Sequence, residues 1–331
     1  MSNLPSNEVI DQIVAGAVQE QATKAPGLRQ VHAKSHGCVW GEFIIADDIP
    51  ESLRIGVFSK VKTYPIWARF SNGSSPLSQG ELQSDKIPDV RGFAIKLMQV
   101  EGKKILEDEP STQDFVMINH AIFFARNAQD YIRLAEVSAG KLSPESMAYE
   151  LGILEQMRAK KVLNPLLIQY WSATPYRLGR QVIRYSAKPQ VLDTADSPIP
   201  DSDNYLREAL KNSLTSKQQD SYFDFLIQLQ PDDDPKWVDD PTLPWDETIC
   251  PYIKVATVKI PSQEFDTLER KQFDEGLSFT PWHTLPEHEP LGSVNAPRLK
   301  VYQTIAKNRR EHNHQATTEP QPFFNPTCQN R

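Results

Sequence analysis

Apolar positions at the start of the chain follow a helical period. Residues 7–24 carry an apolar stripe at the spacing of an amphipathic helix, and Pro26 and Gly27 end it. The stripe consists of Val9, Ile10, Ile13, Val14, Ala17 and Val18. Because the polar face is acidic rather than basic, we expect this helix to lie across the protein itself and not on a membrane surface.

Four short segments after this helix are rich in β-branched and aromatic residues, with turn-forming residues between them. They span residues 39–46, 66–71, 91–99 and 114–118. A loop rich in Ser, Gly and Asn occupies 72–88. Short strands in close succession are typical of an antiparallel barrel or sandwich, so this part of the chain predicts a β core.

The period becomes helical again from 127 to 162, and a short helix is expected at 165–171. Strands are expected again at 181–186, 223–230 and 253–260. No internal repeat and no change of composition divides the chain. We therefore predict an α+β fold, with a β core and helices packed around it.

The domain prediction is a single unit of residues 1–331. Residues 1–26 form its N-terminal helical arm. Residues 315–331 are polar and contain proline, so they are expected to form a loosely held C-terminal tail.

The charge and cysteine content narrow the class of protein. The formal net charge of −7 argues against nucleic acid or an anionic membrane as a partner. The sequence has no run of 18 apolar residues and no secretory signal, so no transmembrane segment is expected. Three distant cysteines, Cys38, Cys250 and Cys328, fit a reducing compartment without a disulfide framework. We expect a cytoplasmic protein.

A pair of residues near the C-terminus suggests a metal ligand. If the stretch is helical, Arg298 and Tyr302 lie four residues apart on one face. A free phenol ionises only near pH ~10, but a fixed cation or a ferric ion beside the oxygen favours the phenolate. Such a pair can build an anionic oxygen ligand for iron, although the same spacing also occurs on ordinary solvated helix faces.

Six stretches in collinear order resemble the haem catalases, and more closely the small catalase-related proteins that lack the catalase C-terminal domain. They are Arg29-Gln-Val-His32-Ala-Lys, Ala68-Arg69-Phe-Ser71, Asp89-Val-Arg91-Gly-Phe-Ala-Ile-Lys96, Gln113-Asp114-Phe-Val, Ile122-Phe-Phe-Ala-Arg126, and Arg298-Leu-Lys-Val-Tyr302 with Arg309. Together they are far more specific than any one of them. The resemblance implies a catalase-like antiparallel β-barrel and haem b with ferric iron, which tyrosine holds in catalases.

Carried over residue by residue, the resemblance implies that Tyr302 is the iron ligand and that Arg298 keeps it ionised. Arg29, Arg69 and Arg309 match the arginines that hold the haem propionates in the family. Bidentate pairs between guanidinium groups and carboxylates suit that task better than lysine does.

On the other face of the haem, the resemblance makes His32 the distal base, with Ser71 hydrogen-bonded near it. An imidazole near pH 7 can take a proton from a hydroperoxide and return it to the leaving oxygen. The family's distal Asn falls at Ile118 here, with Asn119 one place later. Either a register shift lets Asn119 act as the catalytic amide, or the amide is missing and H2O2 dismutation is slower than in full catalases.

Val31 and Phe124 complete the expected cofactor-binding set. Phe123 and Phe124 either line the haem pocket or fill the barrel, and both interpretations stay open. The missing C-terminal domain would leave a wider channel that admits organic hydroperoxides. The family also suggests a homodimer.

The resemblance thus predicts a haem enzyme that acts on hydrogen peroxide or organic hydroperoxides as a catalase or peroxidase. One alternative is a fatty-acid hydroperoxide lyase of the allene-oxide-synthase type, but that branch carries Thr before the distal histidine, where this chain has Val31. A second alternative is a haem-binding protein without turnover. Ile118 at the position of the distal amide keeps that alternative open.

Overall fold

A closed antiparallel barrel forms the centre of the computed structural model, which describes residues 4–192 and 197–323. Its strands are β1 (Ser35–Ile45), β2 (Thr63–Asn72), β3 (Arg91–Leu97), β4 (Gln113–Ile118), β5 (Tyr170–Trp171), β7 (Gln181–Pro189), β8 (Ser221–Leu229) and β9 (Ile253–Ile260). They pair in the order β5-β4-β3-β2-β1-β9-β8-β7, and a β5–β7 pairing closes the ring. The short β6 (Tyr176–Leu178) pairs with β7 alone. The predicted antiparallel barrel is confirmed.

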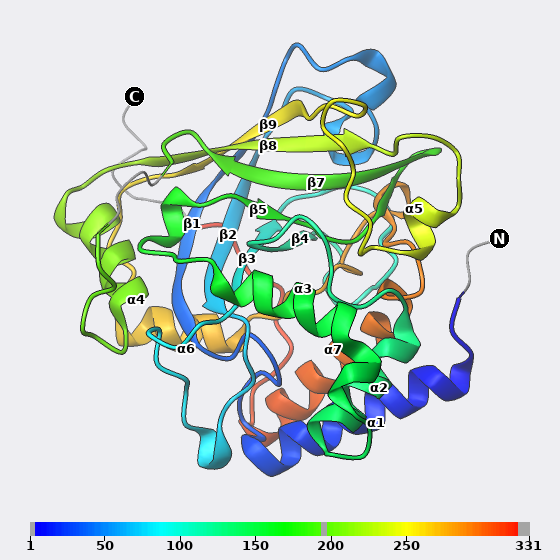
Figure 1. Cartoon of the computed structure of the whole chain (residues 1–331). Coiled ribbons are helices and arrows are strands. Elements are labelled where there is room, and N and C mark those ends of the chain that lie inside the picture. Colours follow the sequence, from blue (N-terminus) through cyan, green and yellow to red (C-terminus); the bar gives the residue numbers. More distant parts are fainter. Residues whose placement is uncertain (1–3, 193–196, 324–331) are drawn as a thin grey trace.

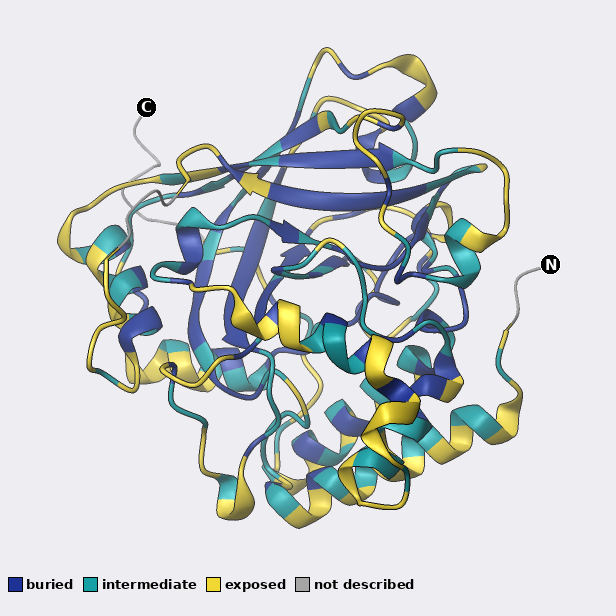
Figure 2. Ribbon diagram, viewed as in Figure 1, coloured by how far each residue is buried: buried dark blue, intermediate teal, exposed yellow. Residues whose placement is uncertain are grey.

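Aromatic side chains fill the barrel. Phe43, Phe115, Phe225 and Tyr185 are at most 4% exposed, and neighbouring rings among them lie with centroids 4.8–5.8 Å apart. A barrel of this size is just wide enough for side chains to fill its interior. The barrel is therefore a solid core, dark blue in Figure 2, and any ligand cavity must lie outside it.

Helices surround the barrel (Figure 1). In the described part of the chain they are α1 (Asn7–Lys24), α2 (Ala128–Ser138), α3 (Ala148–Ala159), α4 (Tyr205–Lys211), α5 (Lys236–Asp239), α6 (Leu268–Gly276) and α7 (Asn295–His312). The predicted helix at residues 7–24 is confirmed, and its apolar stripe is the half-buried face. The first and last helices pack together, with the Gln21 side chain donating to the Ile305 carbonyl at 3.2 Å. No helix of the described residues is long and apolar enough to cross a membrane.

One local prediction was wrong. The expected helix at 165–171 is a single 3-10 turn, Pro165–Leu167, followed by β5, whose residues Tyr170 and Trp171 pair with β4 and β7. Barrel closure therefore overrides local helix propensity there. In the described part of the expected C-terminal tail, the Trp67 indole donates to the Gln321 carbonyl at 3.0 Å, and that the tail is loosely held stays a prediction. Residues 324–331 of that tail lie outside the described residues.

Candidate haem cavity and its surroundings

A cavity of about 140 Å³ lies between the barrel and α7, where β2, β3, β4 and the segment before β1 face that helix. Most of its exposed lining is apolar. Eight of the ten predicted site residues line it, namely Arg29, Val31, His32, Arg69, Ser71, Arg298, Tyr302 and Arg309. The structure therefore brings together groups that lie up to 280 positions apart in the chain (309 − 29).

Tyr302 and its guanidinium partner form one wall of the cavity. On α7, Nη2 of Arg298 donates to the Tyr302 phenol oxygen at 3.0 Å, as the four-residue spacing predicts. Nη1 of the same side chain donates to Asn295 Oδ1 at 2.8 Å, which fixes the guanidinium. Burial alone would lower the pKa of Arg298, but the oxygens of Tyr302, Tyr176 and Tyr131 raise it above its ordinary value. The pair is thus a fixed cation held against a phenol.

His32 lines the same cavity. Its backbone is in the left-handed region, with φ of 55°, and its N–H donates to the Gly73 carbonyl at 3.1 Å. Nδ1 of the ring lies 3.0 Å from Ser71 Oγ. Burial, reinforced by the positive charge of Arg69, lowers the pKa of His32 to about 4. The imidazole is therefore neutral at pH 7 and can accept a proton.

Gly92 makes room for that imidazole, although the sequence analysis did not single it out. It lies on β3 directly opposite Ser71 on β2. A Cβ atom on Gly92 would lie 2.5 Å from His32 Nδ1 and 2.7 Å from Ser71 Oγ. The sequence Arg91-Gly92-Phe93 could have indicated this role, because a glycine inside a strand often marks a place where another group approaches the backbone closely.

A cluster of three arginines closes one end of the cavity. Nε of Arg69 donates to Asp274 Oδ1 at 2.7 Å, and Nη1 of Arg29 donates to Glu275 Oε2 at 3.1 Å. Arg309 donates to the carbonyl oxygens of Glu275 and Leu277 at 2.6 and 2.7 Å. Both carboxylates belong to α6, a helix that the sequence did not predict.

This arginine cluster, Arg29, Arg69 and Arg309, holds more positive charge than its partners neutralise. Three guanidinium groups face two carboxylates, those of Asp274 and Glu275. Burial, and then the charge of Arg29, lower the pKa of Arg309. Its buried Nε finds no hydrogen-bond partner among the described residues. The cluster is therefore suited to a ligand that carries carboxylates.

Asn119 and Phe124 are the two predicted site residues that the structure does not bring to the cavity. The Asn119 side chain is buried and accepts a hydrogen bond from the Arg91 backbone N–H at 2.9 Å, while Ile118 lines the cavity. Phe124 stacks on Phe123 at 4.5 Å, and only Phe123 lines the cavity. The wall where the family has an amide is therefore apolar here.

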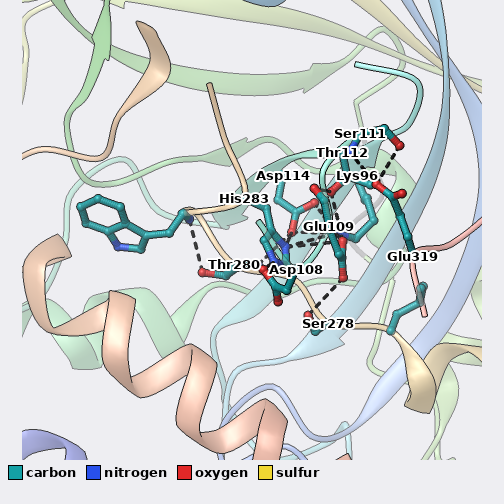
Figure 3. Close-up of polar contacts among 12 residues, drawn as sticks. Lys96, Asp108, Glu109, Ser111, Thr112, Asp114, Ser278, Thr280, His283 and Glu319 are labelled. Atoms are coloured by element: carbon teal, nitrogen blue, oxygen red, sulfur yellow. Dashed lines mark hydrogen bonds and ion pairs between the residues drawn. The ribbon is translucent and has the colours of Figure 1, made fainter. Parts of the chain in front are cut away.

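A second group of buried charges lies beside the cavity, in the cluster drawn in Figure 3. The Lys96 ammonium contacts Glu109 and lies 2.7 Å from Asp114 Oδ1. The His283 ring lies 3.1 Å from both Asp114 and Asp108. Glu109, Asp114 and His283 could offer ligand atoms to a metal ion. The Lys96 ammonium already contacts the carboxylates of Glu109 and Asp114. We therefore assign the positive charge that balances them to Lys96 and not to a metal ion.

The histidine of this cluster should make the stability of the fold depend on pH. Burial opposes its charge, but hydrogen bonds to Asp108 and Asp114 prevail and raise the pKa of His283 to about 9. Because the pKa in the folded state lies above the unfolded value of ~6.5, protonation of the ring stabilises the folded state. This stabilisation is complete below pH ~6.5 and is lost as pH rises to about 9.

We therefore expect the free energy of unfolding to fall by about 3 kcal/mol between pH 6.5 and pH 9 through this group. Urea denaturation of the wild type and of His283→Gln at both values tests this, since the variant should lack the loss. His312→Gln, at an exposed histidine, is the control. Equal pH dependence in wild type and His283→Gln would contradict the assignment.

Comparison with known proteins gives a family-model match over part of the chain and a fold for the whole. Residues 11–150 match the family model for catalase. A fungal catalase is 20% identical with a TM-score of 0.64, over 87% of this chain and 60% of that one. Catalase A from Saccharomyces cerevisiae is 19% identical with a TM-score of 0.66, over 92% of this chain and 67% of that one. No curated protein sequence matches the chain.

A bacterial catalase is 18% identical with a TM-score of 0.66, and the match covers all of this chain and 68% of that protein. The chain thus spans about 60–68% of the length of these three catalases. The resemblance inferred from the motifs is confirmed: residues 11–150 match the catalase family, and the chain has the catalase fold.

Proposed function

We propose that the chain is a haem-dependent oxidoreductase that reacts with hydroperoxides and holds haem b in the cavity. The observation that carries this proposal is the convergence of two pairs on one space. Tyr302 with Arg298 and His32 with Ser71 both line it. Ligation of iron and transfer of a proton at the same substrate require these groups to share a cavity.

The lining fits the chemistry of a haem. Side chains such as Val116, Val301 and Ile305 present apolar surface, as a porphyrin face requires. The arginine cluster has one guanidinium more than its carboxylate partners, and the Nε of Arg309 is unpaired among the described residues. Two propionate groups would supply the missing acceptors.

When bound, the haem supplies a redox-active iron that takes up the oxidising equivalents of a hydroperoxide. Tyr302 would hold this iron through its phenol oxygen, and Arg298, which is always protonated, would favour the anionic form of that oxygen. Arg29, Arg69 and Arg309 would bind the propionates and orient the cofactor.

In the same cavity, His32 would take the proton from the hydroperoxide and deliver it to the oxygen that leaves. Its lowered pKa keeps it unprotonated at neutral pH, and Ser71 fixes the ring through Nδ1. The other ring nitrogen is then the one that exchanges the proton.

The absence of a side chain at Gly92 should be essential for the position of the His32 ring. We expect Gly92→Ala to lower the rate of reaction with hydroperoxides by about 100-fold, because the added Cβ displaces the His32 ring from its position. Stopped-flow mixing of the haem-loaded protein with hydroperoxide measures this rate. Gly152→Ala, on α3 with nothing within 4 Å of the added Cβ, is the control and should react like the wild type. An unchanged rate in Gly92→Ala would mean that the ring is not held as described.

Ile118 favours organic hydroperoxides over H2O2. The side chain offers no hydrogen bond to polarise a small peroxide, and with Phe123 and Met117 it gives an apolar surface for an alkyl group. We therefore propose a peroxidase with a preference for organic hydroperoxides.

We expect Ile118→Asn to raise the rate with H2O2 relative to cumene hydroperoxide by about tenfold, the effect of one added hydrogen bond. Ile118→Leu, which adds no polar group, should leave the ratio of the two rates unchanged. A ratio that moves equally in both variants would show that volume at this position, rather than an amide, sets the preference.

Three assays on the haem-loaded protein test the proposed function. Oxidation of a reducing dye with organic hydroperoxide supports the peroxidase, and release of O2 from H2O2 supports a catalase. An epoxide product from a fatty-acid hydroperoxide without consumption of reductant would replace the proposal with a lyase. Absence of all three activities would leave a haem-binding protein. Sedimentation of the same sample tests the expected homodimer.

A further inference from the structure

A second cavity lies on the neighbouring face of α7. It has a volume of about 440 Å³ and shares Ser278, Phe279, Tyr302 and Ala306 with the first cavity. Its other α7 residues are Gln303, Lys307, Arg310 and Glu311. The α7 residues of this lining follow the helical period and form one stripe, at positions 302, 303, 306, 307 and 310. This stripe lies next to the one that carries Arg298 and Arg309.

The second cavity is polar, in contrast to the first. Asp108, Ser278, Thr280 and His283 form its floor, and these four residues appear together in Figure 3. Gln315 and Thr317, which follow α7, complete the lining. The buried Oε1 of Gln315 has no hydrogen-bond partner among the described residues. The cavity therefore offers several groups that can hydrogen-bond a ligand.

The acidic side chains around this cavity are paired with other cations, and one guanidinium remains without an ion pair among the described residues. Asp108 is paired with His283 at 3.1 Å, and Glu311 with Lys307 at 3.8 Å. Arg310 is half-buried, and its charge is one of the influences that lower the pKa of Asp108, but its guanidinium makes no hydrogen bond or ion pair with a side chain in the described ranges. A partly buried guanidinium with five donors and no acceptor is suited to a carboxylate or a phosphate.

We propose that this second cavity binds a small anion, a carboxylate- or phosphate-bearing molecule, through Arg310. Hydrogen bonds from the Gln303, Thr280 and Thr317 side chains would accompany that ion pair. The volume is in the range of pockets for metabolite-sized ligands. Because Tyr302 belongs to both linings, the anion would lie on the far side of the residue proposed to hold iron. The inference stands whether or not the first cavity holds haem.

Calorimetric titration with inorganic phosphate and with malonate tests this site. It uses the full chain at low ionic strength, loaded with haem so that the arginine cluster of the first cavity is occupied. We expect saturable binding of at least one probe, and the tighter probe identifies the anionic group. Arg310→Gln should weaken binding at least about tenfold, the value of one charge-assisted hydrogen bond. Lys300→Gln, which removes one positive charge from α7 outside both linings, should leave the affinity unchanged.

A second variant tests the site independently in case Arg310→Gln does not fold. Gln315→Glu keeps the size of the side chain and places a carboxylate in the lining, so it should abolish binding while Arg310 is intact. Thermal unfolding of each variant checks that it is folded. Absence of saturable binding for both probes would overturn the inference, as would binding that survives Arg310→Gln or Gln315→Glu. If haem does not load, the number of anions bound per chain is compared between the wild type and each variant. Loss of one binding site in both variants then supports the inference, and an unchanged number overturns it, because neither substitution touches the arginine cluster of the first cavity.

Discussion

Tyr302→Phe is expected to lower the haem content of the purified protein and to remove the ferric spectrum of a phenolate complex. The substitution deletes the one oxygen that Arg298 holds against the cavity at 3.0 Å and leaves the ring in place. Without that oxygen, α7 offers no anionic donor in the lining, since its other lining residues there are apolar or cationic. Absorption spectra and haem-to-protein ratios, measured after identical reconstitution, give the result.

Tyr131→Phe is the matched control for this experiment. Tyr131 is also a tyrosine close enough to Arg298 to raise the pKa of that guanidinium, but it does not line the cavity. The control should keep both the haem content and the spectrum of the wild type. If Tyr302→Phe also keeps the wild-type spectrum, Tyr302 does not ligate the iron and another donor must be sought.

The residues that could be predicted well are those whose partners are set by a regular period. Arg298 and Tyr302 lie one helical turn apart, so a correctly predicted helix is enough to place their side chains together. Strand β9 was predicted with its observed bounds because five of its eight residues are β-branched and successive ones are separated by at most one other residue. Both features are determined by residues that are neighbours in the sequence.

The placement of Asn119 could not be predicted, because it depends on where a strand ends. Ile118 is the last residue of β4 and pairs with Gly92 and Trp171. Successive residues of a strand face opposite sides, so an uncertainty of one position exchanges the isoleucine and the amide. The pairing that fixes this register comes from β3, which pairs with all six residues of β4, and β5 adds one further pair. A single-sequence pattern does not show which residues of two strands face each other.

The carboxylates of the arginine cluster were missed for a different reason. Asp274 and Glu275 lie on α6 and contact Arg29 and Arg69 from more than 200 positions away. α6 has few apolar residues, and no single-sequence pattern links its acidic residues to distant arginines. Contacts of this kind follow from the closed barrel, which brings both segments to the same end of the cavity.

Loss of the imidazole should have the second large effect. We expect His32→Ala to keep its haem, because Tyr302 and the arginine cluster are untouched, but to react with hydroperoxides about 10²–10⁴ times more slowly. In the wild type the rate should stay constant from pH 8 to pH 5 and fall as pH approaches 4, since the base works only when unprotonated and the pKa of His32 is lowered to about 4. Stopped-flow rates across this range measure both effects.

His312→Ala provides the control, because that histidine is exposed at the end of α7 and lines neither cavity. Free imidazole added to His32→Ala should restore part of the rate, since the space vacated by the ring opens into the cavity. A structural role alone would give no such rescue. A wild-type rate in His32→Ala would show that another group moves the proton, and Ser71, whose hydroxyl lies 3.0 Å from the ring, would be the next residue to replace.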